Sequence, residues 1–171
     1  MASGQKKVVI RRFAGPLAWG YLPQTAVVHD HMVPLMAVDG RVTPIFLNEI
    51  KTIAYVRDFN LDDVVEPERI GRKSFLARPR GEGLWLKIIF QDADSLEGLI
   101  TVDLLLLEAL IDDRGLFLTP PDGRGNTQRV FVPRTAVRSM EVLGYITSPS
   151  KRKAQVAMDD SQPSLFGEGV E

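Results

Sequence analysis

The 171-residue sequence contains no cysteine, only two histidines and no long apolar run. Without cysteine there is no disulfide framework, no thiolate nucleophile and no cysteine-ligated metal. The longest run of leucines, Leu104 to Leu107, is far too short to cross a bilayer. A formal net charge of −1 argues against a general nucleic-acid-binding surface but leaves room for a local basic patch. Residues Met1–Lys7 lack the apolar core of a signal peptide, so a cytoplasmic protein is expected.

The signatures of common enzyme classes are also missing. The sequence has no P-loop, no dinucleotide-binding glycine fingerprint and no HExxH motif. Ser95 and Ser139 stand outside any nucleophile-elbow pattern. We therefore expect a protein that is not an enzyme and that uses no cofactor.

The two histidines, His29 and His31, are two residues apart. On a predicted strand over Thr25–Met32 their imidazoles would point to the same face, where both could meet one metal ion. A catalytic zinc site usually has a third protein ligand, and no motif in the sequence supplies it. The favoured interpretation is a polar strand edge facing solvent, and no metal site is expected.

Two parts of the sequence match each other. Residues Ile45–Val56 align without gaps on Val132–Leu143, and Leu17–Leu22 resembles Ser95–Ile100. This internal repeat predicts two small, related β modules. Because cores of this size are marginal, the modules are expected to pack on one another.

Turn residues support the same division. Each copy carries an aspartate–glycine pair, Asp39-Gly40 and Asp122-Gly123, and the first is a strong hairpin signal. Asn48 and Thr135 occupy the same place in the two copies. There a short polar side chain is expected to cap a single helical turn.

Short apolar segments bounded by glycine and proline predict the strands. The first module has Lys6–Phe13, Trp19–Leu22, Thr25–Met32, Met36–Val38, Ile45–Leu47 and Thr52–Val56. The second module has Leu84–Phe90, Leu96–Val102, Leu116–Leu118, Arg129–Val132 and Ser139–Val142. Asp103–Ile111 fits either a helical turn or a short buried strand.

The predicted organisation has four parts. A first small β-barrel module covers residues 5–60, and a charged, partly helical linker covers 61–82. In the linker, Pro67 stands at a helix start, with acids before it and bases after it. A second small β-barrel module covers residues 83–146. Residues 147–171 are polar and lack periodicity, which predicts a disordered tail.

Strands this short and evenly spaced are typical of small barrels. The order of strand, glycine-containing strand, hairpin, single helical turn and closing strand resembles Sm-like and SH3-like barrels. The expected fold class is therefore all-β (mainly β), with two tandem barrels of this kind. Their unpaired strand edges also favour a homo-oligomer.

The folded part, about residues 6–146, resembles a group of uncharacterised bacterial proteins. The shared pattern consists of Arg78–Arg80, Gly83–Trp85, Leu96–Gly98, Phe117–Asp122, Val130–Arg134 and Val142–Gly144. The resemblance covers most of the chain and implies no particular activity.

A more distant resemblance to PilZ domains would imply a cyclic dinucleotide held by an arginine pair and an Asp-x-Ser-x-x-Gly strand. Ser95–Gly98 matches the second half of that motif, but Ala93 stands where the acid is required. A nucleotide- or nucleic-acid-binding regulatory module is the alternative function. Trp85 or Phe117 could stack a base, unless these rings belong to the core. The candidate phosphate contacts are Arg69, Arg72, Lys73, Arg78 and Arg80.

The tail segment Gln162-Pro163-Ser164-Leu165-Phe166 resembles the bacterial sliding-clamp-binding peptide, Gln-Leu-Ser/Asp-Leu-Phe. The resemblance implies that Gln162, Ser164, Leu165 and Phe166 contact a protein partner, with Leu165 and Phe166 in an apolar pocket. Pro163 departs from the usual leucine and removes one apolar contact. Otherwise Leu165 and Phe166 would pack back on the body. The leading hypothesis is a non-enzymatic cytoplasmic adaptor, tethered to the DNA sliding clamp through its tail.

Overall fold

The computed structural model describes residues 5–23, 28, 30–59, 72–122 and 125–147. Ten strands, one α-helix and two single-turn 3-10 helices make up the secondary structure of these residues. The strands form a seven-stranded sheet, in the order β4-β3-β2-β1-β5-β9-β8, and a three-stranded sheet, in the order β10-β6-β7. The expected all-β class is confirmed.

The first module contains five strands and a 3-10 helix. They are β1 (Gln5–Arg12), β2 (Ala18–Pro23), β3 (Met32–Met36), β4 (Val42–Phe46), η1 (Leu47–Glu49) and β5 (Ile50–Val56). β1 is central, and it pairs antiparallel with β2 on one side and β5 on the other. Asp39 and Gly40 form the turn between β3 and β4, as predicted. The Arg41 N–H donates to Asp39 Oδ1 at 3.0 Å, and Gly40 has a φ of 83°.

The second module repeats this order with an α-helix added. Its elements are β6 (Gly83–Phe90), β7 (Ser95–Ile100), α1 (Leu104–Ile111), β8 (Gly115–Leu118), β9 (Thr127–Pro133), η2 (Arg134–Ala136) and β10 (Val137–Ile146). β6 pairs with β7 and β10, and β8 pairs with β9. The ambiguous segment at 103–111 is a helix, because the Asp103 carboxylate caps it by accepting the Leu106 N–H at 3.1 Å.

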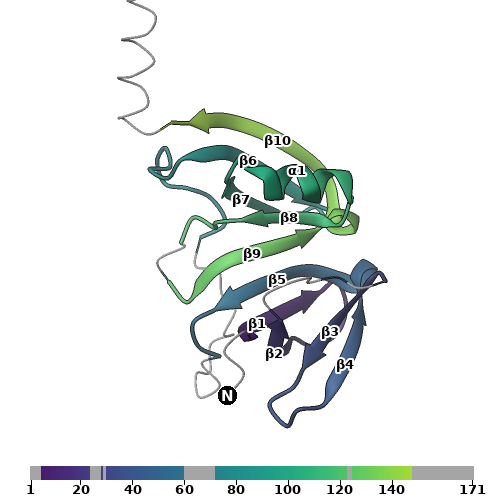
Figure 1. The fold of residues 1–171 in the computed structure, drawn as a ribbon. Coiled ribbons are helices and arrows are strands. Elements are labelled where there is room, and N and C mark those ends of the chain that lie inside the picture. The colour runs from purple at the N-terminus through teal and green to yellow at the C-terminus, as the bar shows by residue number, and fades with distance from the viewer. Residues whose placement is uncertain (1–4, 24–27, 29, 60–71, 123–124, 148–171) are drawn as a thin grey trace, which may run out of the picture.

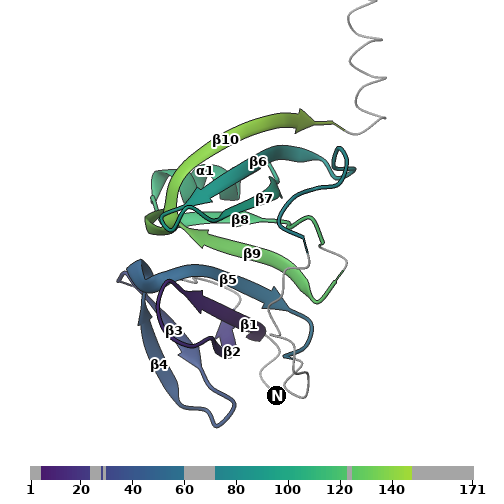
Figure 2. The same cartoon turned by 180° about the vertical axis from the view of Figure 1, so that it is seen from behind.

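The two modules share one sheet. β5 and β9 pair antiparallel, with Ile53 opposite Phe131 and Ala54 opposite Val130. Figures 1 and 2 show these strands side by side where the modules meet. Neither sheet closes into a barrel in the described parts of the chain. The expectation of closed, separate barrels is therefore corrected, because the free edge of each module is paired with the other module. The Sm-like and SH3-like resemblance stays a prediction.

Both modules use the same backbone hydrogen bonds around the 3-10 helix. The first N–H of η1, from Leu47, donates to His31 O at 2.9 Å, and that of η2, from Arg134, donates to Arg114 O at 3.0 Å. The expected caps from Asn48 and Thr135 are wrong, since neither 3-10 helix has a side-chain cap. The backbone carbonyl oxygens of His31 and Arg114 accept these first N–H groups instead. The two local structures correspond, while the internal repeat itself stays a prediction.

The matching glycines of the second strands, Gly20 and Gly98, allow a close approach of the next strand. A Cβ on Gly20 would collide with the backbone carbonyl oxygen of Met36, and one on Gly98 would lie 2.5 Å from Leu118 Cδ1.

Each module has its own apolar core, and Phe131 of β9, a strand of the second module, lies in the core of the first module. The modules therefore pack on one another, as expected.

Part of the predicted linker is described. Residues 72–82 contain no helix, and they lie against β7, where the Glu97 N–H donates to Lys73 O at 2.7 Å. The Phe75 N–H and the Trp85 indole N–H both donate to Glu97 Oε2, each at 3.1 Å. The helix predicted at Pro67 and the tail at 148–171 lie outside the described residues.

Candidate functional site

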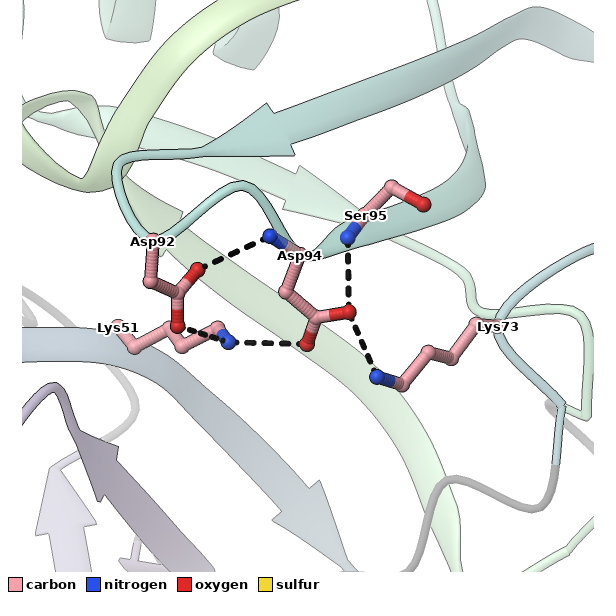
Figure 3. A network of polar contacts seen from close by, with 5 residues as sticks. All are labelled: Lys51, Lys73, Asp92, Asp94 and Ser95. Carbon is pink, nitrogen blue, oxygen red and sulfur yellow. Dashed lines mark hydrogen bonds and ion pairs between the residues drawn. The ribbon is translucent and has the colours of Figure 1, made fainter.

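A buried lysine joins the two modules. Lys51 lies on β5 with only 8% of its surface exposed. Its Nζ lies 2.7 Å from Asp92 Oδ2 and 2.9 Å from Asp94 Oδ2, in the turn between β6 and β7. Lys73 donates to the other oxygen of Asp94 at 2.6 Å. Figure 3 shows these four residues, which we call the lysine–aspartate junction.

The junction is a fully satisfied polar network. Asp92 Oδ1 accepts the Asp94 N–H at 3.2 Å, and Asp94 Oδ1 accepts the Ser95 N–H at 2.9 Å, so each carboxylate oxygen has a partner. Burial raises the pKa of both acids, but the hydrogen bonds from the lysines and the backbone outweigh it and hold each pKa below its ordinary range. The Lys51 ammonium also lies 5.0 Å from the Phe90 ring centroid. We interpret the junction as structural, because every carboxylate oxygen in it already accepts a hydrogen bond from within the protein.

A cleft of about 570 Å³ lies between the modules beside η1 and η2. Its lining comprises Val28, Asp30, His31, Leu47, Gln91, Asp112, Asp113, Arg114, Arg134, Thr135 and Val137. Figures 1 and 2 show the connections from β4 to β5 and from β9 to β10 on the same side of the molecule. The Thr135 hydroxyl of η2 donates to Leu47 O of η1 at 3.3 Å, so the two modules also touch beside the cleft. The cleft is thus a feature that neither module makes alone.

Most charges in the cleft neutralise one another. Arg134 Nε lies 3.4 Å from Asp113 Oδ1, and Arg114 Nη2 lies 3.3 Å from Asp112 Oδ2. These pairs are exposed and hold the side chains only weakly. Asp30 remains as an unbalanced acid beside His31. The cleft therefore offers mixed charges and no strong preference for an anion or a cation.

The predicted strand that was to place both histidines on one face is wrong at His31. Asp30 and His31 form a turn before β3, with left-handed φ values of 45° and 62°, so the predicted strand does not extend through them. His29 lies outside the described residues. Among the residues that the structure does describe, no group of three histidine, aspartate or glutamate side chains is placed to hold a metal ion.

The predicted phosphate-binding residues do not gather in either cavity that the structure reveals. Lys73 is committed to Asp94 in the lysine–aspartate junction. Arg72, Arg78 and Arg80 are exposed, and none of them lines the cleft beside η1 and η2 or the cavity beneath α1. Arg69 lies outside the described residues, as do the predicted partner contacts Gln162, Ser164, Leu165 and Phe166.

A feature that the sequence did not reveal is an exposed apolar stripe on α1. Leu104, Leu107 and Leu110 are 75%, 55% and 55% exposed, and their spacing places them on one side of the helix. We call these three residues the leucine face. Leu106 and Ala109, on the other side, pack against the core of the second module. Single exposed leucines are ordinary, but three on an eight-residue helix form a contiguous apolar patch.

The surroundings of the leucine face are acidic. Asp103, Glu108 and Asp112 are exposed on or beside α1, and the helix itself carries no lysine or arginine. Within the described ranges, no helix is long and apolar enough to cross a membrane. Acidic groups also repel the anionic surface of a bilayer. The leucine face therefore suits a protein surface with a basic rim better than a lipid surface.

Comparison with known protein families assigns the chain to one family. The model of a family of unknown function, DUF6982, matches residues 4–144, which is most of the 171-residue chain. No curated protein and no solved structure matches the chain.

Proposed function

The chain belongs to the DUF6982 family, and we propose that this member is a non-enzymatic adaptor that binds a protein partner through the leucine face of α1. The observation that carries the proposal is the exposure of Leu104, Leu107 and Leu110, each more than half accessible to solvent. Apolar patches of this kind typically mark interaction sites. The partner surface is apolar with lysine or arginine at its rim, which complements Asp103 and Glu108.

The lysine–aspartate junction supports this proposal. It holds the two modules in one arrangement, with β5 paired to β9 and Lys51 bonded to both acids. A docking helix on a fixed scaffold loses little conformational entropy when it binds. A second copy of this chain is a poorer partner, because two leucine faces in contact would bring Asp103 and Glu108 of both copies together.

The proposal is tested by site-specific photo-crosslinking at Leu107 in cells. The matched control places the crosslinker at Leu76, which is 79% exposed but lies in the segment before β6. We expect a discrete adduct from Leu107 that disappears when Leu104 and Leu110 are both changed to glutamine. The identified protein is then purified and its affinity for the wild-type chain is measured. Absence of an adduct, or an adduct that persists in the glutamine variant, contradicts the proposal.

The sliding-clamp tether is a separate part of the proposal and rests on the Gln162–Phe166 motif alone. Calorimetry of the full chain with purified clamp tests it. We expect saturable binding that is lost in a Leu165→Ala, Phe166→Ala double variant and retained in Leu107→Gln. If the clamp does not bind, or the double variant binds equally well, the tether is discarded and the leucine-face proposal stands unaffected.

A further inference from the structure

A second cavity lies beneath α1 in the second module. In the described part of the chain, the pairing between β7 and the end of β8 consists of the isolated bridge between Leu99 and Thr119, and residues of both strands and of α1 line the cavity. The cavity has a volume of about 350 Å³, which is within the range of small-molecule pockets. Seven of its eleven lining residues are apolar, among them Leu99, Ile100, Leu106, Ala109, Leu116 and Leu118, and polar groups make up about half of the exposed lining.

One cation stands at the rim of this cavity. Arg129 is among the lining residues, and its guanidinium lies 4.5 Å from the centroid of the Phe117 ring, which packs against the core of the first module. Within the described chain, no carboxylate lies within ion-pair distance of Arg129. Its neighbour Tyr55 stays neutral, because burial raises the pKa of that phenol to about 12 even though Arg129 lowers it. Arg129 therefore carries a positive charge that has no counter-charge in its own module.

The other charged group at the rim is Asp103. Its carboxylate is engaged as the N-cap of α1, through the Leu106 N–H. It makes no ion pair with Arg129, so the two charges occupy separate points of the rim. An anion that enters the cavity can therefore reach Arg129 while its chain passes under α1.

We propose that the cavity beneath α1 binds a medium-chain carboxylate, with its acyl chain against Leu106, Ala109 and Leu116 and its carboxylate on the Arg129 guanidinium. Arginine and carboxylate form a bidentate, charge-assisted pair, which fixes the orientation of the head group. Burial of the chain supplies the affinity. Thr101 and Thr119 at the rim add hydroxyl groups that can hydrogen-bond the same carboxylate. This site is distinct from the leucine face and does not depend on the adaptor proposal.

Calorimetry with the full-length protein and decanoate, below its micellar concentration, tests the site. We expect binding of one decanoate per chain, and affinity that rises about fourfold for each methylene added from hexanoate to decanoate. Decanol, which has the same chain without the charge, should bind at least tenfold more weakly. This comparison uses only the wild-type protein, so it does not depend on the folding of any variant.

Three variants locate the two ends of the ligand. Arg129→Gln should weaken decanoate binding about tenfold or more and leave decanol binding unchanged, whereas the exposed control Arg138→Gln should change neither. Ala109→Leu, which fills the cavity, should abolish both. Asp103→Asn keeps the helix cap and removes a negative charge that repels the carboxylate of the ligand. It should tighten decanoate binding roughly two- to fivefold. Equal affinity for decanol and decanoate, undetectable binding, several ligands per chain, or an unaffected Arg129→Gln variant would each overturn the proposal.

Discussion

The ammonium of Lys51 lies 2.9 Å from the carboxylate of Asp94, and this ion pair joins β5 of one module to the β6–β7 turn of the other. The lysine is almost fully buried, and the aspartate also receives Lys73 from the segment before β6. Three parts of the chain that are distant in sequence thus converge on one carboxylate. This contact adds to the pairing of β5 with β9 and to the packing of Phe131, which also join the two modules.

Replacement of Lys51 by methionine should destabilise the protein by about 2 kcal/mol. Removing one partner of a buried pair costs ~3–5 kcal/mol, but Asp92 and Asp94 are partly exposed and can be solvated by water, which reduces the loss. Urea denaturation gives the free energy of unfolding. The control is Lys7→Met, which breaks the exposed, solvent-screened pair with Asp58 and should lower the stability much less. Equal decreases in the free energy of unfolding in the two variants would show that the lysine–aspartate junction stabilises the protein no more than an exposed ion pair does.

Stability should fall as the pH drops below about 4, the ordinary pKa of an aspartate. Asp92 and Asp94 have folded-state pKa values below those of the unfolded chain, so their contribution is present above that pH. It is lost as the pH falls from the unfolded value through the folded values. The Lys51→Met variant lacks the largest lowering contribution to the pKa of Asp92 and one of the contributions at Asp94, where Lys73 remains, so it should have a flatter acid limb. Parallel curves for the two proteins would contradict this assignment.

Alanine at Gly20 should cost more stability than alanine at Gly98. The new methyl group would meet the backbone carbonyl oxygen of Met36 at Gly20. At Gly98 its nearest contact would be Leu118 Cδ1 at 2.5 Å, with Leu118 Cβ at 3.0 Å. A side chain can rotate away, whereas a paired strand cannot move without losing its ladder. We expect about 1–3 kcal/mol for Gly98→Ala and a larger loss for Gly20→Ala. The melting temperatures rank the two variants. Gly144→Ala is the control, because this strand glycine has no positive φ and its new methyl group would meet only Trp85, at an ordinary 3.9 Å.

Much of the scaffold could be predicted from local sequence. Apolar periodicity predicted the ends of β1 and β6 to within one residue, and Asp39-Gly40 predicted the hairpin between β3 and β4. These features could be predicted because their signals lie within a few neighbouring residues. The His31 turn was missed because the surrounding valine and methionine residues favour a strand. The capping prediction for Asn48 failed because a carbonyl from distant His31 satisfies the helix N–H.

The candidate sites were harder to predict because they depend on contacts between distant residues. Nothing in the neighbours of Lys51 identifies Asp92 and Asp94 as its partners, since the modules first have to pair through β5 and β9. The run Leu104–Leu107 has no clear period, so neither its helical state nor its exposed side could be deduced. Only the packing of Leu106 on the core shows which leucines remain outside.

Loss of the Asp103 cap should loosen α1 without unfolding the protein. A helix of eight residues is too short to be stable by itself, so the cap matters. Asp103→Ala should cost about 1 kcal/mol locally, which corresponds to roughly fivefold faster amide hydrogen exchange in α1. Asp103→Asn retains a capping oxygen and should exchange at the wild-type rate. Unchanged exchange in the alanine variant would mean that packing alone holds the helix.

The most direct test of the adaptor proposal is the affinity of the purified partner, identified by crosslinking at Leu107, for three forms of this chain. We predict that Leu107→Gln weakens binding at least tenfold, as expected for loss of a central apolar contact, while Leu76→Gln binds as the wild type does. Analytical ultracentrifugation of the same samples shows whether the chain alone is monomeric. Equal affinity of Leu107→Gln and wild type, or a dimer that dissociates in Leu107→Gln and so assigns the face to a second copy, would contradict the proposal.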